Sequence, residues 1–137
     1  MKTREGETMA DTGTPRTTVL VVEDSEDTRY LWRLALEQKG YRVLEAADGE
    51  AAVEVALRER PDIILMDIGL PVLDGFKAAE RLRAEPATRD ALILALTAHN
   101  ETEYRANALA AGFNAYVTKP VDFDWLDDLL KQLLPSD

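Results

Sequence analysis

Short apolar runs alternate with amphipathic stretches along most of the chain, and this alternation is the strongest constraint on its fold. Strands of a parallel sheet that is covered on both faces read as continuous runs of Val, Ile and Leu. Amphipathic stretches between such runs predict strand–helix–strand units. We therefore expect an α/β fold, with a five-stranded parallel sheet and helices on both of its faces. The expected strands are Val19–Val22, Tyr41–Ala46, Ile63–Met66, Leu92–Leu96 and Ala115–Val117. The second strand is more polar than the others, which suits an edge of the sheet.

Capping residues and the spacing of apolar residues predict the helices. Ser25 can act as the N-cap of a first helix that runs through Gln38. Within it, we expect Leu31, Leu34 and Ala35 to form the apolar stripe that faces the sheet. The later helices are expected from about Gly49 to Glu59, after Asp74 up to Pro86, from about Glu101 to Ala111, and over the stretch that carries Phe123, Leu126, Leu129, Leu130 and Leu133.

The first residues of the chain lack this alternation. Residues 1–17 hold Thr, Gly, Pro and charged residues in no periodic order, which is typical of a disordered segment. We expect a disordered N-terminal tail over residues 1–17 and one domain over residues 18–135, which is a usual domain size. Met9 offers an alternative start, and the sequence does not decide between the two.

Composition excludes several kinds of chemistry. The chain has no cysteine, which rules out disulfides, cysteine-ligated zinc and thiolate catalysis. Its single histidine, His99, rules out metal sites with several histidine ligands. The net charge of -10 disfavours binding to nucleic acid or to anionic lipid. No apolar run approaches the ~20 residues of a membrane helix, and we expect a soluble protein of the cytoplasm.

Polar residues follow four of the expected strands, at the sheet edge where open parallel sheets bind ligands. These residues are Glu23 and Asp24, Asp67, Thr97, and Lys119. Three carboxylates gathered at one edge would repel one another unless a cation lay among them. Mg²⁺ prefers oxygen ligands from carboxylates, water and phosphate, and together with one lysine it would balance the three charges. The sequence thus predicts a magnesium site at this edge.

The segments that carry these residues resemble the response-regulator receiver domain, the phospho-acceptor module of two-component signalling. The segments are Val21–Ser25, Leu65–Pro71 with Asp74–Gly75, Leu96–Ala98 and Tyr116–Pro120. The resemblance extends from about Thr18 to Leu134, and four motifs in the right order and spacing are highly specific. We accordingly expect the flavodoxin-like form of the (βα)5 fold.

The resemblance implies roles in phosphoryl transfer. Asp67 would accept a phosphoryl group from a phosphohistidine of a sensor histidine kinase or a histidine phosphotransfer protein. Glu23 and Asp24 would hold Mg²⁺ together with Asp67 and the backbone carbonyl of Gly69, and Mn²⁺ is an alternative ion. Gly69 and His99 occupy two positions that would help to set the lifetime of the phosphoryl group. Such a transfer needs mainly positioning and charge neutralisation, which these groups supply.

The resemblance also implies how the site would signal. Thr97 and Lys119 would contact the bound phosphoryl group, with a cis peptide bond between Lys119 and Pro120. As the phosphoryl group draws Thr97 inward, Tyr116 would rotate into the vacated space. The face formed by the fourth helix, the fifth strand and the fifth helix would then change shape.

We expect a stand-alone receiver domain that signals through a separate protein. The residues after Lys119 suffice for the last helix but not for an output domain. A downstream protein would dock on the face just described, including Val121 and Trp125, and a phosphorylation-dependent homodimer stays open. The chain would be a signalling module and not an enzyme, although it would promote its own phosphorylation and dephosphorylation.

Other interpretations lead to different functions. An unphosphorylated, receiver-like binding module would keep the fold without the chemistry, although every residue of the site is present. A Mg²⁺-dependent phosphatase with Asp67 as its nucleophile would need an acid/base Asp two residues later, where Gly69 stands. A flavin-binding flavodoxin would share the fold, but a flavin phosphate needs hydrogen-bond donors, and the turn over residues 23–27 instead carries four acidic residues. Trp32 and Trp125 lie off the main apolar stripes of their helices. Each is either a half-buried packing residue or an anchor in an interface with another protein.

Overall fold

The structure, a computed structural model, describes residues 16–68, 74–98 and 102–134 of the chain. In this part of the chain, five parallel strands form one sheet in the order β2-β1-β3-β4-β5. The strands are β1 (Thr18–Val22), β2 (Arg42–Ala46), β3 (Ile63–Asp67), β4 (Leu92–Thr97) and β5 (Ala115–Thr118). The helices are α1 (Glu26–Gln38), α2 (Gly49–Glu59), α3 (Gly75–Ala84), α4 (Thr102–Ala111) and α5 (Phe123–Leu133). The predicted flavodoxin-like (βα)5 fold is confirmed.

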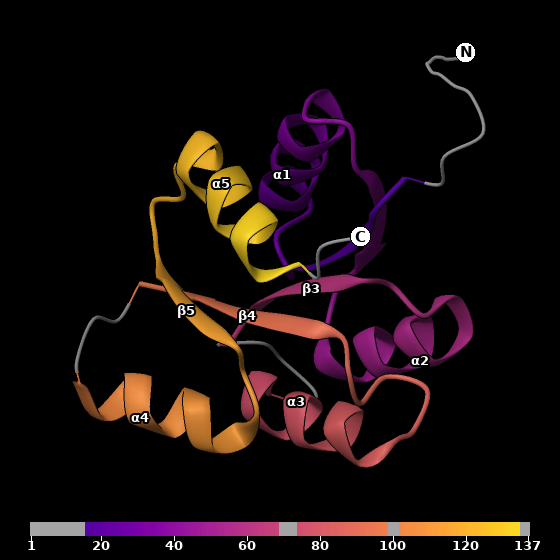
Figure 1. Cartoon of the computed structure of the whole chain (residues 1–137), viewed down its shortest axis with the longest axis vertical. Helices are drawn as coiled ribbons and strands as arrows, with labels where there is room; N and C mark the ends of the chain where they lie inside the picture. The colour runs from indigo at the N-terminus through magenta and orange to yellow at the C-terminus, as the bar shows by residue number, and fades with distance from the viewer. Residues whose placement is uncertain (1–15, 69–73, 99–101, 135–137) are drawn as a thin grey trace.

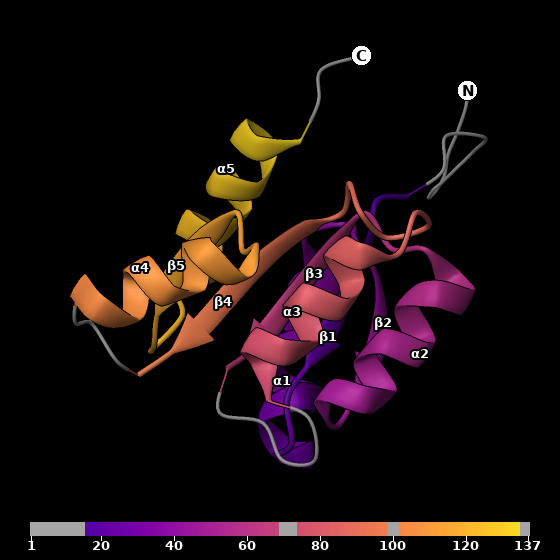
Figure 2. The same cartoon turned by 90° about the horizontal axis from the view of Figure 1, so that it is seen from below.

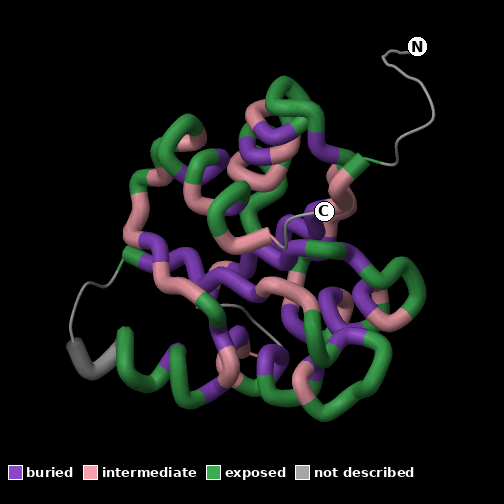
Figure 3. Tube along the Cα trace, in the orientation of Figure 1, coloured by how far each residue is buried: buried purple, intermediate pink, exposed green. Residues whose placement is uncertain are grey.

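Helices cover both faces of the sheet. Figure 1 shows α1 and α5 on one face and α2, α3 and α4 on the other, and Figure 2 shows the same layers from below. Alternate residues of β1 point into the two layers: Leu20 and Val22 pack with the second group of helices, and Val19 and Val21 with the first. Figure 3 shows the buried residues concentrated along the sheet and the inner helix faces. Burial on both faces explains the continuous apolar runs of the sequence.

The predicted strand ends agree with the structure to within one residue. β2 lies at an edge of the sheet, as its polar sequence predicted. Ser25 caps α1 by accepting a hydrogen bond from Thr28 N, and Asp74 caps α3 in the same way. β3 and β4 each extend one residue further than predicted, so Asp67 and Thr97 belong to the sheet itself. Their positions are therefore fixed by strand pairing.

The prediction of which residues of α1 face the sheet is wrong. Leu31 is 62% exposed and Leu34 is 38% exposed, whereas Trp32 and Leu36 are 7% and 1% exposed. Trp32 and Leu36 are one helical turn apart, so they share a face. Apolar residues occur on two sides of this helix. The side that carries Trp32 packs against the sheet, because burial of the large indole removes the most apolar surface from water.

Some predictions fall on residues that the structure does not describe. Residues 1–15 of the expected tail, which include Met9, lie outside the described ranges, as do Gly69 and His99. The predicted division into a tail and a domain over residues 18–135 therefore stays a prediction. Across the described ranges, no helix has both the length and the apolar character needed to cross a membrane.

A buried hydrogen bond joins α5 to the residue before β2. The Tyr41 hydroxyl donates to Asp127 Oδ1 at 2.6 Å, and Lys131 Nζ lies 3.1 Å from Asp127 Oδ2. Burial raises the pKa of Asp127, but the Tyr41 hydrogen bond and the Lys131 ammonium lower it by more, so this pKa lies below its ordinary value. Burial and the neighbouring Asp127 raise the pKa of Tyr41, which remains a hydrogen-bond donor.

We expect Asp127 to stabilise the fold at neutral pH but not in acid. A carboxyl whose pKa is lower in the folded state contributes stability above its unfolded pKa, about 3.9 for aspartate, and loses it as the pH falls through the folded value. The wild type should exceed Asp127→Asn by about 1–2 kcal/mol in free energy of unfolding at neutral pH. Below about pH 4 the difference should shrink toward zero. Urea unfolding over this pH range measures it, and a difference that is independent of pH would contradict the assignment.

Candidate functional site

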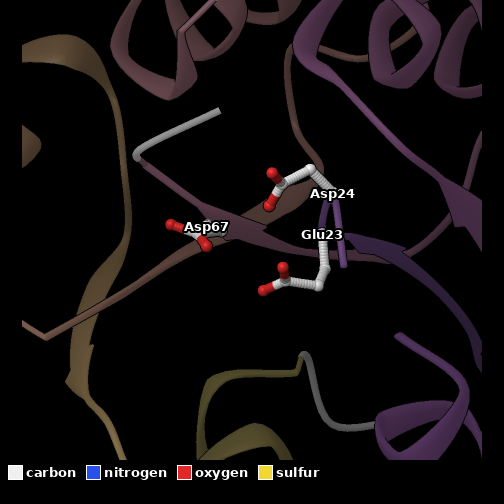
Figure 4. Close-up of side chains that lie close together, drawn as sticks. All are labelled: Glu23, Asp24 and Asp67. Atoms are coloured by element: carbon white, nitrogen blue, oxygen red, sulfur yellow. The ribbon is translucent and has the colours of Figure 1, made fainter. Parts of the chain in front are cut away.

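Three carboxylates meet at the carboxyl edge of the sheet. Glu23 and Asp24 follow β1, and Asp67 is the last residue of the neighbouring strand β3. Each offers a carboxylate oxygen, and these oxygens lie within 4.8 Å of one another. Figure 4 shows the side chains of Glu23 and Asp24 reaching toward Asp67 from the end of β1. The structure thus brings together the three acidic residues of the predicted site.

An ammonium group joins these carboxylates. Lys119, directly after β5, donates a hydrogen bond from Nζ to Asp67 Oδ2 at 3.0 Å. The same Nζ lies 3.6 Å from Glu23 Oε1. One positive charge therefore faces three negative ones, which leaves the cluster with an excess of negative charge. The peptide bond between Lys119 and Pro120 is cis, in agreement with the prediction.

Glu23 is the most deeply placed of the three acids. Its side chain is 5% exposed, and Oε2 accepts a hydrogen bond from Ser25 N at 2.9 Å. Oε1 is buried and, among the buried side-chain nitrogen and oxygen atoms of the described residues, is the one without a hydrogen-bond partner. Burial raises the pKa of Glu23, and Asp24 and Asp67 raise it further, against the lowering effects of Ser25 N and Lys119. The buried oxygen suits a bound cation, which would offset these costs.

Hydrogen bonds from α1 hold the segment that carries Glu23. Arg29 Nη1 donates to the backbone carbonyl of Glu23 at 2.8 Å, and Arg29 Nε donates to Glu45 Oε1 at 2.9 Å. Arg29 thereby ties the end of β1 to the edge strand β2. Arg29 was not among the residues predicted from the sequence, where its one signal is its place one turn after the N-cap Ser25.

Helix α3 packs directly against the backbone that follows Asp67. A Cβ atom built on Gly75 would lie 2.7 Å from Ile68 Cα and 3.1 Å from the backbone oxygen of Asp67. Gly75 N also donates to the backbone oxygen of Ile68 at 3.3 Å. The position therefore has no room for a side chain. In the sequence, Gly75 stood out only as part of a motif, and no structural role was predicted for it.

Thr97 and Tyr116 lie on the neighbouring strands. Thr97 ends β4, is 2% exposed, and accepts a hydrogen bond at its backbone oxygen from Lys119 N at 2.8 Å. Tyr116 is half-buried in β5, and its ring centroid lies 5.0 Å from Arg105 Cζ of α4. Thr97 therefore lies on the strand next to that of Asp67, and Tyr116 lies on the following strand, where it contacts α4.

Sequence comparison identifies relatives over most of the chain. The model of the response regulator receiver domain matches residues 19–131. An uncharacterized 14.6 kDa protein of Leptolyngbya boryana is 41% identical over 104 residues, which make up 76% of this chain and 79% of that protein. The phosphate regulon transcriptional regulatory protein PhoB of Pseudomonas aeruginosa is 38% identical over 103 residues, or 75% of this chain and 45% of PhoB. The chain spans half or less of the length of the transcriptional regulators that it matches.

Solved structures with the same fold are also found. The chemotaxis protein CheY4 of Vibrio cholerae is 31% identical with a TM-score of 0.83, over 88% of this chain and 100% of that one. The receiver domain of the sensor histidine kinase PA1611 from Pseudomonas aeruginosa is 41% identical with a TM-score of 0.80, over 86% of this chain and 97% of that one. That structure has a magnesium ion coordinated in its active site cleft. From its sequence match and its fold, this chain belongs to the response regulator receiver domain family.

Proposed function

We propose that this receiver domain accepts a phosphoryl group on Asp67 from a phosphohistidine of a partner protein. The observation that carries the proposal is the meeting of three carboxylates with the Lys119 ammonium, which lies 3.0 Å from Asp67 Oδ2. The side chain of Asp67 is 16% exposed, so a donor can reach it from solvent. Membership in a family of two-component signalling proteins supports the same function.

The acidic cluster fits a magnesium ion. Glu23 Oε1 is a buried oxygen without a hydrogen-bond donor, and the carboxylate oxygens around it are the ligands that Mg²⁺ prefers. We propose that Glu23, Asp24 and Asp67 hold the ion, with the backbone carbonyl of Gly69 as a further ligand. Mn²⁺ favours the same kind of oxygen site and is proposed as a substitute. When bound, the ion supplies charge neutralisation for the phosphoryl oxygens.

Asp67, Lys119 and Thr97 have distinct parts in the proposed transfer. A carboxylate oxygen of Asp67 forms a bond to phosphorus as the bond from phosphorus to the donor's imidazole nitrogen breaks. Lys119 already contacts Asp67, so its ammonium stays within reach of the new phosphoryl oxygens. Thr97, at the end of the adjacent strand β4, donates a hydrogen bond from its hydroxyl to a phosphoryl oxygen. Donors placed where charge develops are the main contribution that a protein makes to such a reaction.

Thr97 and Tyr116 are proposed to pass the signal to the face formed by α4, β5 and α5. The Tyr116 ring contacts Arg105, so a rotation of this ring would change a contact between β5 and α4. On the same face Val121 is half-buried and Trp125 is 53% exposed, which suits docking of a downstream protein. A phosphorylation-dependent homodimer stays a prediction.

We propose a signalling module that promotes only its own phosphorylation and dephosphorylation. The proposed donor is a sensor histidine kinase or a histidine phosphotransfer protein, since both carry phosphohistidine. The stand-alone character and the cytoplasmic location stay predictions, as does the influence of Gly69 and His99 on the phosphoryl lifetime.

Intact-mass spectrometry tests the proposed function. With a small acyl-phosphate donor and Mg²⁺, the wild type should gain the mass of one phosphoryl group. It should gain none when Mg²⁺ is chelated, and Asp67→Ala and Asp67→Asn should gain none at all. Asp128→Asn removes one exposed carboxylate of α5 as a matched control and should behave as the wild type.

Other outcomes point to the alternative functions. A gain that persists in Asp67→Asn would place the acceptor elsewhere. If the wild type neither gains mass nor binds a beryllofluoride mimic, an unphosphorylated protein-binding module becomes the better interpretation. Continuous release of phosphate from simple phosphate esters would favour the phosphatase.

A further inference from the structure

The buried indole of Trp32 lies beside the proposed phosphoryl site. Trp32 belongs to α1 and is 7% exposed, and Lys119 Nζ lies 5.6 Å from the centroid of its ring. Trp32 also lines a pocket of about 560 Å³ together with Glu23, Thr28, Lys119, Pro120 and Val121. The helix that packs on the sheet thus contributes an aromatic face to the surroundings of the site lysine.

The position of the Lys119 ammonium depends on what surrounds it. A lysine has a flexible four-carbon stem and a compact charge, so its place is set by its neighbours and not by its own shape. Nζ lies 3.0 Å from Asp67 Oδ2 and 3.6 Å from Glu23 Oε1. The face of the Trp32 ring attracts the cation through its quadrupole at a distance within the usual range for such contacts.

The two kinds of neighbour respond differently to the reaction. Phosphorylation of Asp67 and binding of a metal ion both change the charge of the acidic cluster, so they change its attraction for the ammonium. The attraction of the Trp32 ring does not depend on the charge of any carboxylate. The ring can therefore hold the ammonium in place before and after the phosphoryl group arrives.

We propose that Trp32 is a positioning residue, which keeps the Lys119 ammonium directed at Asp67 during phosphorylation. This inference rests on the proposed function, because it needs Lys119 to act on the phosphoryl group. Trp32 also packs in the apolar core between the sheet, α1 and α5. The test must therefore separate positioning from packing.

Two substitutions of Trp32 separate these roles. Trp32→Phe keeps an aromatic face, whereas Trp32→Leu keeps only an apolar side chain, and both remove buried volume. The rate of phosphoprotein formation from a small acyl-phosphate donor should fall roughly three- to tenfold in Trp32→Leu and less than about threefold in Trp32→Phe. Unfolding midpoints are measured in parallel. If the phosphorylation rates of the two variants fall in step with their unfolding midpoints, whether or not the aromatic ring is kept, the proposal is wrong.

A double-mutant cycle tests whether Trp32 acts through Lys119. In a Lys119→Met background, the additional change Trp32→Leu should cause no further loss of rate, because the ammonium is already gone. If the two losses multiply, Trp32 acts independently of Lys119 and the proposal is wrong. If the wild type takes up no phosphoryl group, the proposed function fails, and the positioning role fails with it. A wild type that is phosphorylated as fast as Trp32→Leu overturns the positioning role alone.

A nuclear magnetic resonance readout needs no phosphoryl donor. The ring current of Trp32 should shift the ε-methylene protons of Lys119 upfield in the wild type, and Trp32→Leu should return them to ordinary lysine positions. Ordinary positions in the wild type would show that the ammonium does not stay over the ring, and would overturn the proposal whatever the rates.

Discussion

Mg²⁺ should raise the thermal unfolding midpoint of the wild-type chain by roughly 10 °C and leave that of Asp24→Asn nearly unchanged. An ion that binds only the folded state stabilises it by about 2.7 kcal/mol when its concentration is about 100 times Kd. For a domain of this size, each 1 kcal/mol corresponds to roughly 3–5 °C. Three carboxylates with oxygens within 4.8 Å of one another, together with the buried Glu23 Oε1 that has no hydrogen-bond donor, make the charged cluster costly until a cation binds.

Asp24 is the most informative of the three acids to replace. It is exposed, so its charge costs the metal-free fold less than that of buried Glu23. Asparagine has nearly the same shape, so the substitution mainly weakens one ligand. Asp27→Asn is the matched control. Asp27 is also exposed and lies in the first turn of α1, and its substitution changes the net charge by the same amount.

Calorimetry or circular dichroism with increasing Mg²⁺ measures these shifts. Asp27→Asn should respond as the wild type does. An equal rise in the wild type and in Asp24→Asn would mean that the ion binds away from this cluster. The absence of any rise in the wild type at high Mg²⁺ would mean that the three carboxylates do not form a metal site.

The sheet and its acidic edge could be predicted because their signals are local. Runs such as Ile63–Met66 are apolar enough to mark buried strands by themselves. Asp67 follows that run directly, so the rule that parallel strands end at one edge brings it toward Glu23 and Asp24. Lys119 and Asp67 are 52 positions apart, and the same rule applied to the last strand predicted that they meet at one edge, where the structure shows a hydrogen bond between them.

Features that depend on packing between distant elements could not be predicted. Apolar residues on two sides of α1 led to a wrong prediction of its inward face, and only the packed structure shows Trp32 and Leu36 buried. The contact of Trp32 with Lys119 follows from that orientation. The bond between Tyr41 and Asp127 joins residues 86 positions apart with no motif around either. The sequence likewise gives no sign of the crowding around Gly75, because a glycine at the start of a helix has many explanations.

Gly75→Ala should destabilise the fold by about 1–3 kcal/mol and slow phosphorylation of Asp67 by roughly tenfold or more. Helix propensity alone predicts the opposite sign, because alanine in a helix is favoured over glycine by up to about 1 kcal/mol. The added Cβ would lie 2.7 Å from Ile68 Cα, however, and this neighbour is backbone that cannot turn away. Relief of the clash must move α3 or the end of β3, and the second movement displaces the acceptor.

Gly40→Ala is the matched control for this prediction. Gly40 has a φ of 97°, where a side chain is strained, but a Cβ there would meet nothing within 4 Å. It lies between α1 and the start of β2, at the amino ends of the strands, whereas the acidic cluster lies at their carboxyl ends. The control should lose about 1 kcal/mol of stability and keep its phosphorylation rate. If Gly75→Ala loses stability but phosphorylates as fast as Gly40→Ala, the clash is relieved by movement of α3 alone. The close packing of this helix would then stabilise the fold without positioning Asp67.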